Sequence, residues 1–229
     1  VVGTDAAKDM IVYQQPDTTY STTVTNTKDE RYVLISSDST LATELQYADA
    51  ADPKLAFRVF LPRERGHEYS AEHLDGRWII RTNWNARNFR IMSAPVGGHA
   101  GREHWQEIVP HDEGTYVAGF DVFRDFLALE ERSEGLRRIR IRSWSGTRDF
   151  HLEPDDAAYR MALGANEEID SEVVRYTYTS LTTPHTTYDY DVGSGERRLL
   201  KREPVVGDFD PARYATEQLW VTARDGERV

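Results

Sequence analysis

Four segments of this sequence can be laid over one another, and their regular spacing restricts the possible folds more than any other feature. Their anchor residues are aromatic, 46, 48 and 50 residues apart: Tyr32, Trp78, Phe126 and Tyr176. In each segment a short aromatic or β-branched strand runs into a polar turn, and an alternating strand follows. A period of about 40–50 residues with several short strands per unit is typical of β-propeller blades.

Each repeat is predicted to contain four strands. The strands that carry the anchors are residues 31–36, 77–82, 125–130 and 175–180, and the strands after them are residues 44–48, 88–92, 136–141 and 187–191. Candidate inner strands are residues 18–27, 68–74, 115–122 and 159–165, and candidate outer strands are residues 55–60, 105–109, 149–152 and 198–201. A proline follows each outer strand, at positions 62, 110, 154 and 204, and proline suits a strand end because it cannot donate to the ladder.

The sequence therefore predicts an all-β chain with four consecutive four-stranded antiparallel blades, whose anchors are buried at equivalent positions between neighbouring blades. We expect residues 1–16 to end a preceding blade, with a strand at residues 9–13. The four blades are expected at about residues 17–62, 63–110, 111–154 and 155–208. Residues 219–222 follow Tyr176 at a similar interval, but too little chain comes after them for a fifth blade.

Composition excludes several classes of function. Hydrophobic residues make up 39% of the chain and charged residues 29%, which are ordinary fractions for a folded protein. The net charge is −11. No basic cluster stands clear of acidic neighbours, which argues against nucleic-acid binding. The absence of cysteine excludes disulfides, thiolate nucleophiles and Cys-ligated zinc. No apolar run has the length of a membrane span, and the first residues lack the pattern of a signal peptide.

Serine-hydrolase chemistry has no complete motif in this sequence. A nucleophilic serine on a sharp turn usually lies in Gly-x-Ser-x-Gly, which does not occur. Ser194, between Gly193 and Gly195, predicts a hairpin turn. Ser180, His185 and Asp189 are triad residue types, but they lie within one polar connection, so we interpret them as a loop.

Metal and phosphate sites are equally weak candidates. His67 and His73 lie on a predicted strand, about 20 Å apart at a strand's rise, and are interpreted as surface histidines rather than zinc ligands. Neither Asp155-Asp156 nor Glu167-Glu168 has the oxygen-rich spacing of a calcium loop.

Two further clusters are given structural interpretations. Residues 97–101 are glycine-rich but precede no helix, so they predict a hairpin tip rather than a phosphate loop. Glu130, Glu131 and Arg132 are interpreted as a solvated strand face. We therefore assign no catalytic, cofactor-binding or metal-binding residue and expect no cofactor.

The chain resembles oligopeptidase B, also called protease II, a group in the prolyl oligopeptidase family of serine peptidases. The resemblance runs in order along nearly the whole chain. The segments that carry it are residues 82–90, 105–111, 130–136, 175–184, 195–201 and 219–226, with residues 175–184 (RYTYTSLTTP) the closest.

This resemblance implies a seven-bladed propeller that caps an α/β-hydrolase domain, limits substrates to peptides and is not itself catalytic. It implies cleavage after Arg or Lys by a Ser-Asp-His triad whose motifs lie beyond Val229. Residues 9–13 would close the third blade and residues 17–203 would form blades four to seven. Residues 209–229 would cross into the hydrolase domain.

Two functions stay open at this point. The chain is either the gating, substrate-limiting portion of such a peptidase or a freestanding propeller-like protein-interaction module. The first is favoured, because Val229 would fall inside a domain of the resembling family. The expected partners are the hydrolase domain of the same polypeptide and short basic peptides, without nucleic acid or membrane, and the expected location is cytoplasmic.

Overall fold

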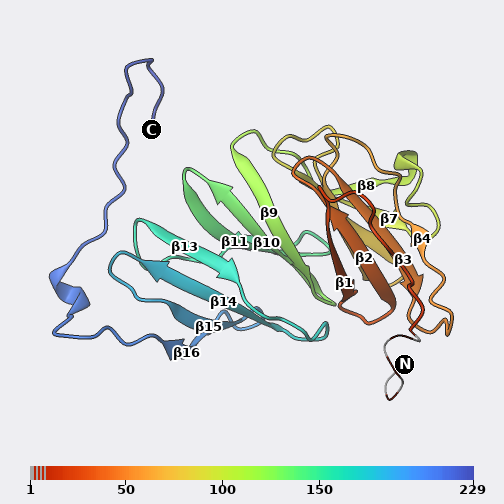
Figure 1. Cartoon of the computed structure of the whole chain (residues 1–229). Coiled ribbons are helices and arrows are strands. Elements are labelled where there is room, and N and C mark those ends of the chain that lie inside the picture. The colour runs from red at the N-terminus through yellow and green to blue at the C-terminus, as the bar shows by residue number, and fades with distance from the viewer. Residues whose placement is uncertain (1–2, 4, 6, 8) are drawn as a thin grey trace.

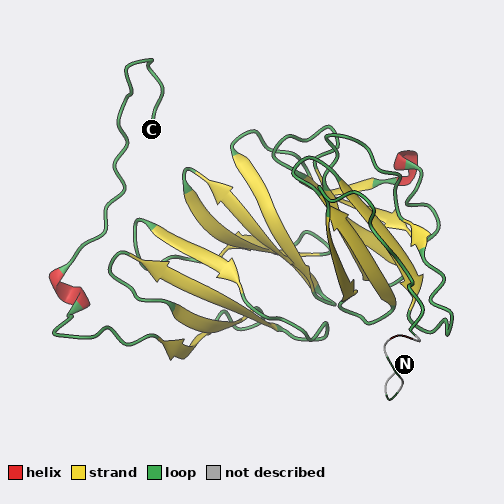
Figure 2. Cartoon of the chain, in the orientation of Figure 1, coloured by secondary structure: helices red, strands yellow, loops and turns green. Residues whose placement is uncertain are grey.

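The strands of this protein form four antiparallel four-stranded units arranged as a fan, and a single parallel bridge between Arg137 and Arg160 joins the last two units (Figure 1). The structure is a computed structural model that describes residues 3, 5, 7 and 9–229. Loops connect the strands, and no α-helix occurs in these residues (Figure 2). None of the helical turns described has the length and apolar character that crossing a bilayer requires.

We name the four units the first to fourth blades, and within each the strands lie side by side in chain order. The first blade holds β1 (Ser21–Asn26), β2 (Tyr32–Asp38), β3 (Thr43–Asp49) and β4 (Arg58–Val59). The second holds β5 (Tyr69–Leu74), β6 (Arg77–Thr82), β7 (Arg90–Pro95) and β8 (Gln106–Val109). The third holds β9 (Thr115–Val122), β10 (Phe126–Ser133), β11 (Leu136–Ser143) and β12 (Asp149–His151). The fourth holds β13 (Tyr159–Leu163), β14 (Val173–Ser180), β15 (Thr186–Asp191) and β16 (Arg197–Arg202). The all-β class and the four four-stranded blades are thus confirmed.

Tight turns fix the strand register in two blades. β5 and β6 are joined by Asp75 and Gly76, and β10 and β11 by Glu134 and Gly135. All four residues have positive φ, between 48° and 78°. Two consecutive residues of this kind twist in the sense of the flanking strands, which is why two-residue hairpins favour Asp-Gly and similar pairs.

The hydrophobic core lies between the blades. One cluster fills the space between the first and second blades and includes Leu34, Phe60 and Trp78. A second cluster lies between the second and third blades, and a third between the third and fourth. Because each middle blade is covered on both faces, its central strands are apolar on successive residues, as in Trp78–Ile79–Ile80.

The four anchors are buried between blades, as expected, but they do not occupy equivalent positions. Tyr32 and Phe126 face the following blade, whereas Trp78 and Tyr176 face the preceding one. The prediction of equivalence was therefore wrong. Side chains alternate across a strand, so an alignment offset of one residue moves a side chain to the opposite face.

Residues 9–13 form no strand, which corrects a second prediction. Within the described residues no neighbouring strand edge pairs with them, and an isolated extended segment has no ladder to join. The segment is instead attached by a side chain, because the hydroxyls of Tyr13 and Ser37 on β2 are 2.9 Å apart.

The outer faces of the first and fourth blades differ in chemistry. On the first blade Val24 of β1 is 65% exposed. On the fourth blade the outer face carries Asp189, bound by Arg175 at 2.8 Å and by Arg198 at 3.1 Å. Within the described residues the fourth blade also exposes apolar side chains, because Leu199 and Leu200 of β16 are 50% and 41% exposed.

The C-terminal segment leaves β16 and passes through a short 3-10 helix, η3 (Pro211–Arg213) (Figure 1). Gln218 donates to the Glu134 carbonyl at 2.8 Å, and the Thr216 and Thr182 hydroxyls are 3.2 Å apart. Beyond these contacts Thr222 and Arg228 pair as a small antiparallel bridge. The segment therefore touches the edge of the fan at which β10 and β14 end.

Candidate functional site

A cavity of about 760 Å³ opens where the inner strands of the first, second and fourth blades converge. Its wall comes from the end of β1 and the turn after it, from β5, and from the loop between β13 and β14. Carboxylates dominate the lining, opposed by the single ammonium of Lys28; they are Asp29, Glu30, Glu72, Glu167 and Glu168.

Lys28 crosses this region and joins three blades. Its Nζ lies 2.7 Å from Oδ1 of Asp121 on β9 and 3.5 Å from the centre of the Phe123 ring. Its backbone N–H donates to Glu72 on β5 at 3.0 Å. The side chain is 8% exposed, so a buried cation from the first blade contacts the third blade.

Burial sets the protonation of the groups around Lys28. Loss of water raises the pKa of Glu72 to about 7, and the hydrogen bond from the Lys28 backbone only partly opposes this. Burial also raises the pKa of Asp121 and lowers that of Lys28, while their mutual ion pair acts in the opposite sense on both. The wall thus carries a carboxyl that titrates near neutral pH.

Further ion pairs tie the blades together along the edge at which β1, β5 and β9 end. Nδ1 of His73 lies 2.5 Å from Asp29, which links the second blade to the first. Arg124 of the third blade binds Asp75 of the second at 3.0 Å and Asp170 of the fourth at 2.5 Å. The inner edge is therefore a chain of charged contacts between successive blades.

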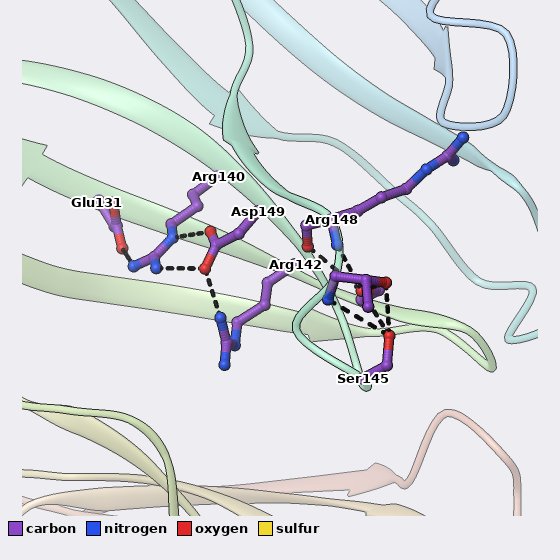
Figure 3. Close-up of polar contacts among 8 residues, drawn as sticks. Glu131, Arg140, Arg142, Ser145, Arg148 and Asp149 are labelled. Atoms are coloured by element: carbon purple, nitrogen blue, oxygen red, sulfur yellow. Dashed lines mark hydrogen bonds and ion pairs between the residues drawn. The ribbon is translucent and has the colours of Figure 1, made fainter.

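Glu131 on β10 is buried in a charged network, and the interpretation of residues 130–132 as a solvated face was wrong for it. Its side chain is 2% exposed and is bound by Arg140 at 3.2 Å and His151 at 2.7 Å. Arg140 also binds Asp149, which contacts Arg142 (Figure 3). Since its contacts join β10, β11 and β12, we assign Glu131 a structural role.

His67 and His73 are both buried, which corrects their interpretation as surface residues. His67 lies 2.9 Å from the Thr82 hydroxyl and 3.1 Å from Arg102, and burial lowers its pKa to about 4. His73 binds Asp29 instead. The two rings have different partners, so they form no common metal site.

The triad residue types near the fourth blade are not assembled into a catalytic centre. The Ser180 hydroxyl contacts Thr182, His185 lies 3.8 Å from Glu203, and Asp189 is held by arginines on the outer face. Ser194 occupies a turn in which its backbone N–H donates to Asp191 at 2.7 Å. In this structure each of these side chains is held by its own local neighbours.

The remaining candidates also have structural partners. Asp155 binds Arg197, and Asp156 accepts hydrogen bonds from Tyr178, Thr182 and Thr183. The loop containing residues 97–101 folds onto the core and leads into a 3-10 helix, η2 (Arg102–His104), so it is more than an exposed hairpin tip. Among the residues that the structure describes, no group of three or more potential ligands is placed to hold a metal ion.

Sequence reasoning missed Lys28, Glu72 and Asp121. Lys28 and Asp121 are 93 positions apart in the sequence, and no local sequence pattern predicts a contact at that separation. An acidic residue inside a mostly apolar inner strand, such as Asp121 between Phe120 and Val122 on β9, is the one available sign.

The comparisons with known proteins agree with this fold. The chain matches the family described as the prolyl oligopeptidase N-terminal β-propeller domain over residues 1–203. It is 40% identical to dipeptidyl aminopeptidase BI of Pseudoxanthomonas mexicana over 99% of this chain and 31% of that protein. It is 27% identical to protease 2 of Moraxella lacunata over 100% of this chain and 32% of that protein. The chain thus spans about a third of the length of these curated relatives.

Solved structures show the same arrangement of blades. Oligopeptidase B from Trypanosoma brucei, in a closed form with covalently bound antipain, superposes with a TM-score of 0.89 at 25% identity, over 100% of this chain and 34% of that one. For oligopeptidase B from Leishmania major the TM-score is 0.88 at 24% identity, over 99% and 33% of the two chains. The family match covers most of the sequence and the fold agrees along its length, so the chain belongs to the prolyl oligopeptidase family, in which its residues 1–203 match the N-terminal β-propeller domain.

Proposed function

We propose that this chain is the non-catalytic, gating portion of a serine oligopeptidase and that it caps an α/β-hydrolase domain of the same polypeptide. The observation that carries the proposal is the family match over residues 1–203. It is supported by the fold shared with oligopeptidase B. In the described part of the chain no serine hydroxyl bonds to a histidine, so the reaction itself is assigned to the hydrolase domain.

The proposed substrates are short peptides cleaved after Arg or Lys. The acidic lining of the 760 Å³ cavity supports this, because a wall of one charge concentrates ligands of the opposite charge. Glu30, Glu167 and Glu168 make no ion pair elsewhere in the described residues, so their charge is free to act on a passing peptide. The blades would then exclude folded proteins by size and favour cationic peptides by charge.

A second candidate is removal of dipeptides from a free N-terminus. The observation that favours it is the 40% identity to dipeptidyl aminopeptidase BI, compared with 27% to protease 2. The recognised group is positively charged in both candidates: a basic side chain in the first and a free N-terminus in the second. The acidic cavity therefore does not distinguish them.

The deciding experiment compares two fluorogenic substrates on the polypeptide that joins this chain to a hydrolase domain. One carries a blocked N-terminus and Arg at the scissile bond, and the other is a dipeptide amide with a free N-terminus. Cleavage of the blocked substrate supports the oligopeptidase assignment. Cleavage of the free dipeptide amide alone supports the aminopeptidase, and cleavage of neither contradicts the proposal.

The acidic wall is tested in the same assay. Glu167→Gln combined with Glu168→Gln should raise KM for a cationic peptide about threefold at low salt, and less at high salt, because salt screens exposed charges. Glu196→Gln, in the turn before β16, is the matched control. A cytoplasmic location is also part of the proposal, and cell fractionation tests it.

A further inference from the structure

A second, smaller cavity lies between the end of β3, the loop from β3 to β4, and the loop after β7. Its volume is about 210 Å³, the share of about seven liquid water molecules. Its lining includes the aromatic Tyr32 and Tyr47, small residues such as Ala56 and Gly97, and the charged Asp52 and Arg58. It is therefore the size of a free amino acid or a small dipeptide.

The two tyrosines of the lining have hydroxyl groups without protein partners. Tyr32 is 8% exposed, yet its hydroxyl makes no hydrogen bond within the described residues, and neither does that of Tyr47. Neither hydroxyl is among the described side-chain atoms that are fully buried without a partner, so water reaches both in the free protein and a ligand could take its place. Both phenols line the cavity, where a ligand could satisfy them.

The lining carries one unpaired charge of each sign. Asp52 accepts the backbone N–H groups of Lys54 and Ala56, and these bonds hold the pKa of its carboxyl below the usual value. It has no ion-pair partner in the part of the chain that is described, and neither does Arg58. Arg58 is near enough to lower the pKa of Asp52 through space, but the two do not touch.

The neighbouring charges are already neutralised. Asp49, also in the lining, is bound by Arg31 at 2.8 Å. Arg58 is the cross-strand neighbour of Tyr47, so both side chains leave the first blade on the same face. The free charges are therefore one carboxylate and one guanidinium beside two phenol hydroxyls.

We propose that this cavity binds a small zwitterion, a free amino acid or a dipeptide, with its ammonium on Asp52, its carboxylate on Arg58 and its polar backbone on the two tyrosine hydroxyls. A ligand with both charges satisfies both unpaired groups at once, which a simple amine or a simple acid cannot do. A guanidinium also matches a carboxylate with two parallel hydrogen bonds. The assignment does not depend on the proposed peptidase function, because it concerns binding alone.

Calorimetric titration of the protein with three probes tests the assignment: diglycine, glycinamide, which lacks the carboxylate, and N-acetylglycine, which lacks the ammonium. Diglycine should bind at least tenfold more tightly than either of the others, a difference of about 1.4 kcal/mol or more. Equal binding of the three probes, or no binding of diglycine at about 20 mM, would overturn the proposal.

Two variants at the charged lining residues then assign each charge. Asp52→Asn should weaken diglycine at least tenfold and leave N-acetylglycine unchanged, whereas Arg58→Gln should weaken diglycine and leave glycinamide unchanged. Arg65→Gln, an exposed arginine outside the cavity, should bind as the original protein does. Diglycine binding that survives both Asp52→Asn and Arg58→Gln would contradict the assignment.

Tyr32→Phe removes only the hydroxyl and should weaken diglycine binding about fivefold. Its circular dichroism and thermal melting are measured first, because Tyr32 is part of the core between the first two blades. If this variant unfolds, the Asp52 and Arg58 variants decide the question alone. If folded Tyr32→Phe binds diglycine with unchanged affinity, the hydroxyl of Tyr32 does not contact the ligand.

Discussion

Lys28 in the first blade and Asp121 in the third form an ion pair of 2.7 Å between two blades that are not adjacent. The two side chains are 8% and 20% exposed, so water screens the pair weakly. Each blade otherwise contacts mainly its immediate neighbours. This pair therefore makes the stability of one blade depend on a blade that is not adjacent to it.

Lys28→Met should lower the free energy of unfolding by about 2–3 kcal/mol. The substitution keeps an unbranched side chain over the Phe123 ring but leaves the carboxylate of Asp121 buried without its cation. Urea unfolding followed by tryptophan fluorescence measures the change. Lys54→Met, an exposed lysine in the loop between β3 and β4, is the control. Adding Asp121→Asn to Lys28→Met should recover part of the loss, and a double variant less stable than the single one would contradict this account.

Stability should fall as pH rises from about 4.5 to about 7 because of Glu72. Burial raises the pKa of this group to about 7 in the folded chain, while the unfolded chain ionises near 4.5. Between these values the unfolded state releases the proton and the folded state keeps it, so the free energy of unfolding falls by about 3 kcal/mol. Above about pH 7 the group is ionised in both states and the difference is constant.

Glu72→Gln should remove this fall in stability. The quantity compared is the difference in the free energy of unfolding between the original protein and the variant at each pH. Glu30→Gln, an exposed glutamate on the same cavity wall, should follow the original profile. Parallel curves for the original protein and Glu72→Gln across pH 5–7 would show that Glu72 does not titrate in this window.

The chain alone should show no peptidase activity. None of its described serines has the histidine and carboxylate partners of a nucleophile, so a fluorogenic peptide ending in Arg should be cleaved at the rate of buffer. The measurement requires repurified protein, because trace proteases give false rates. Turnover that is lost on mutation of a residue in this chain would refute the prediction.

The isolated chain should self-associate through the outer face of the first blade. Val24 and Val59 are 65% and 48% exposed in one cross-strand row of this face, which no neighbouring blade among the described residues covers. Light scattering at several concentrations should show association that Val24→Lys weakens. Thr187→Lys, on the polar outer face of the fourth blade, should leave it unchanged. A monomer at every concentration would mean that the first face is already covered.

Much of the fold could be predicted because the strands are local features. Residues 77–82 and 115–122 were predicted within the bounds that the structure has, and β16 extends by one residue at each end of residues 198–201. Turn residues, prolines and alternating side chains indicate where each strand begins and ends, and all of these signals lie within a few residues of the strand itself. The domain boundaries and the crossing at residues 209–229 stay predictions.

Partners across blades could not be predicted in the same way. The face that each anchor occupies depends on alternation within its own strand, which alignment of aromatic residues ignores. His73 looks like a surface residue by type, and only the contact with Asp29 of the preceding blade makes its burial tolerable. The acidic cavity combines three separate blades, so its members share no sequence motif.

The contact between Lys28 and Asp121 also sets an order of events during folding. Each blade consists of hairpins between neighbouring strands, which close short loops and form early, whereas this pair joins residues 93 positions apart. It can form only when the first and third blades already flank the second. Its formation is therefore a late step, and a substitution at Lys28 should speed unfolding while leaving the folding rate nearly unchanged.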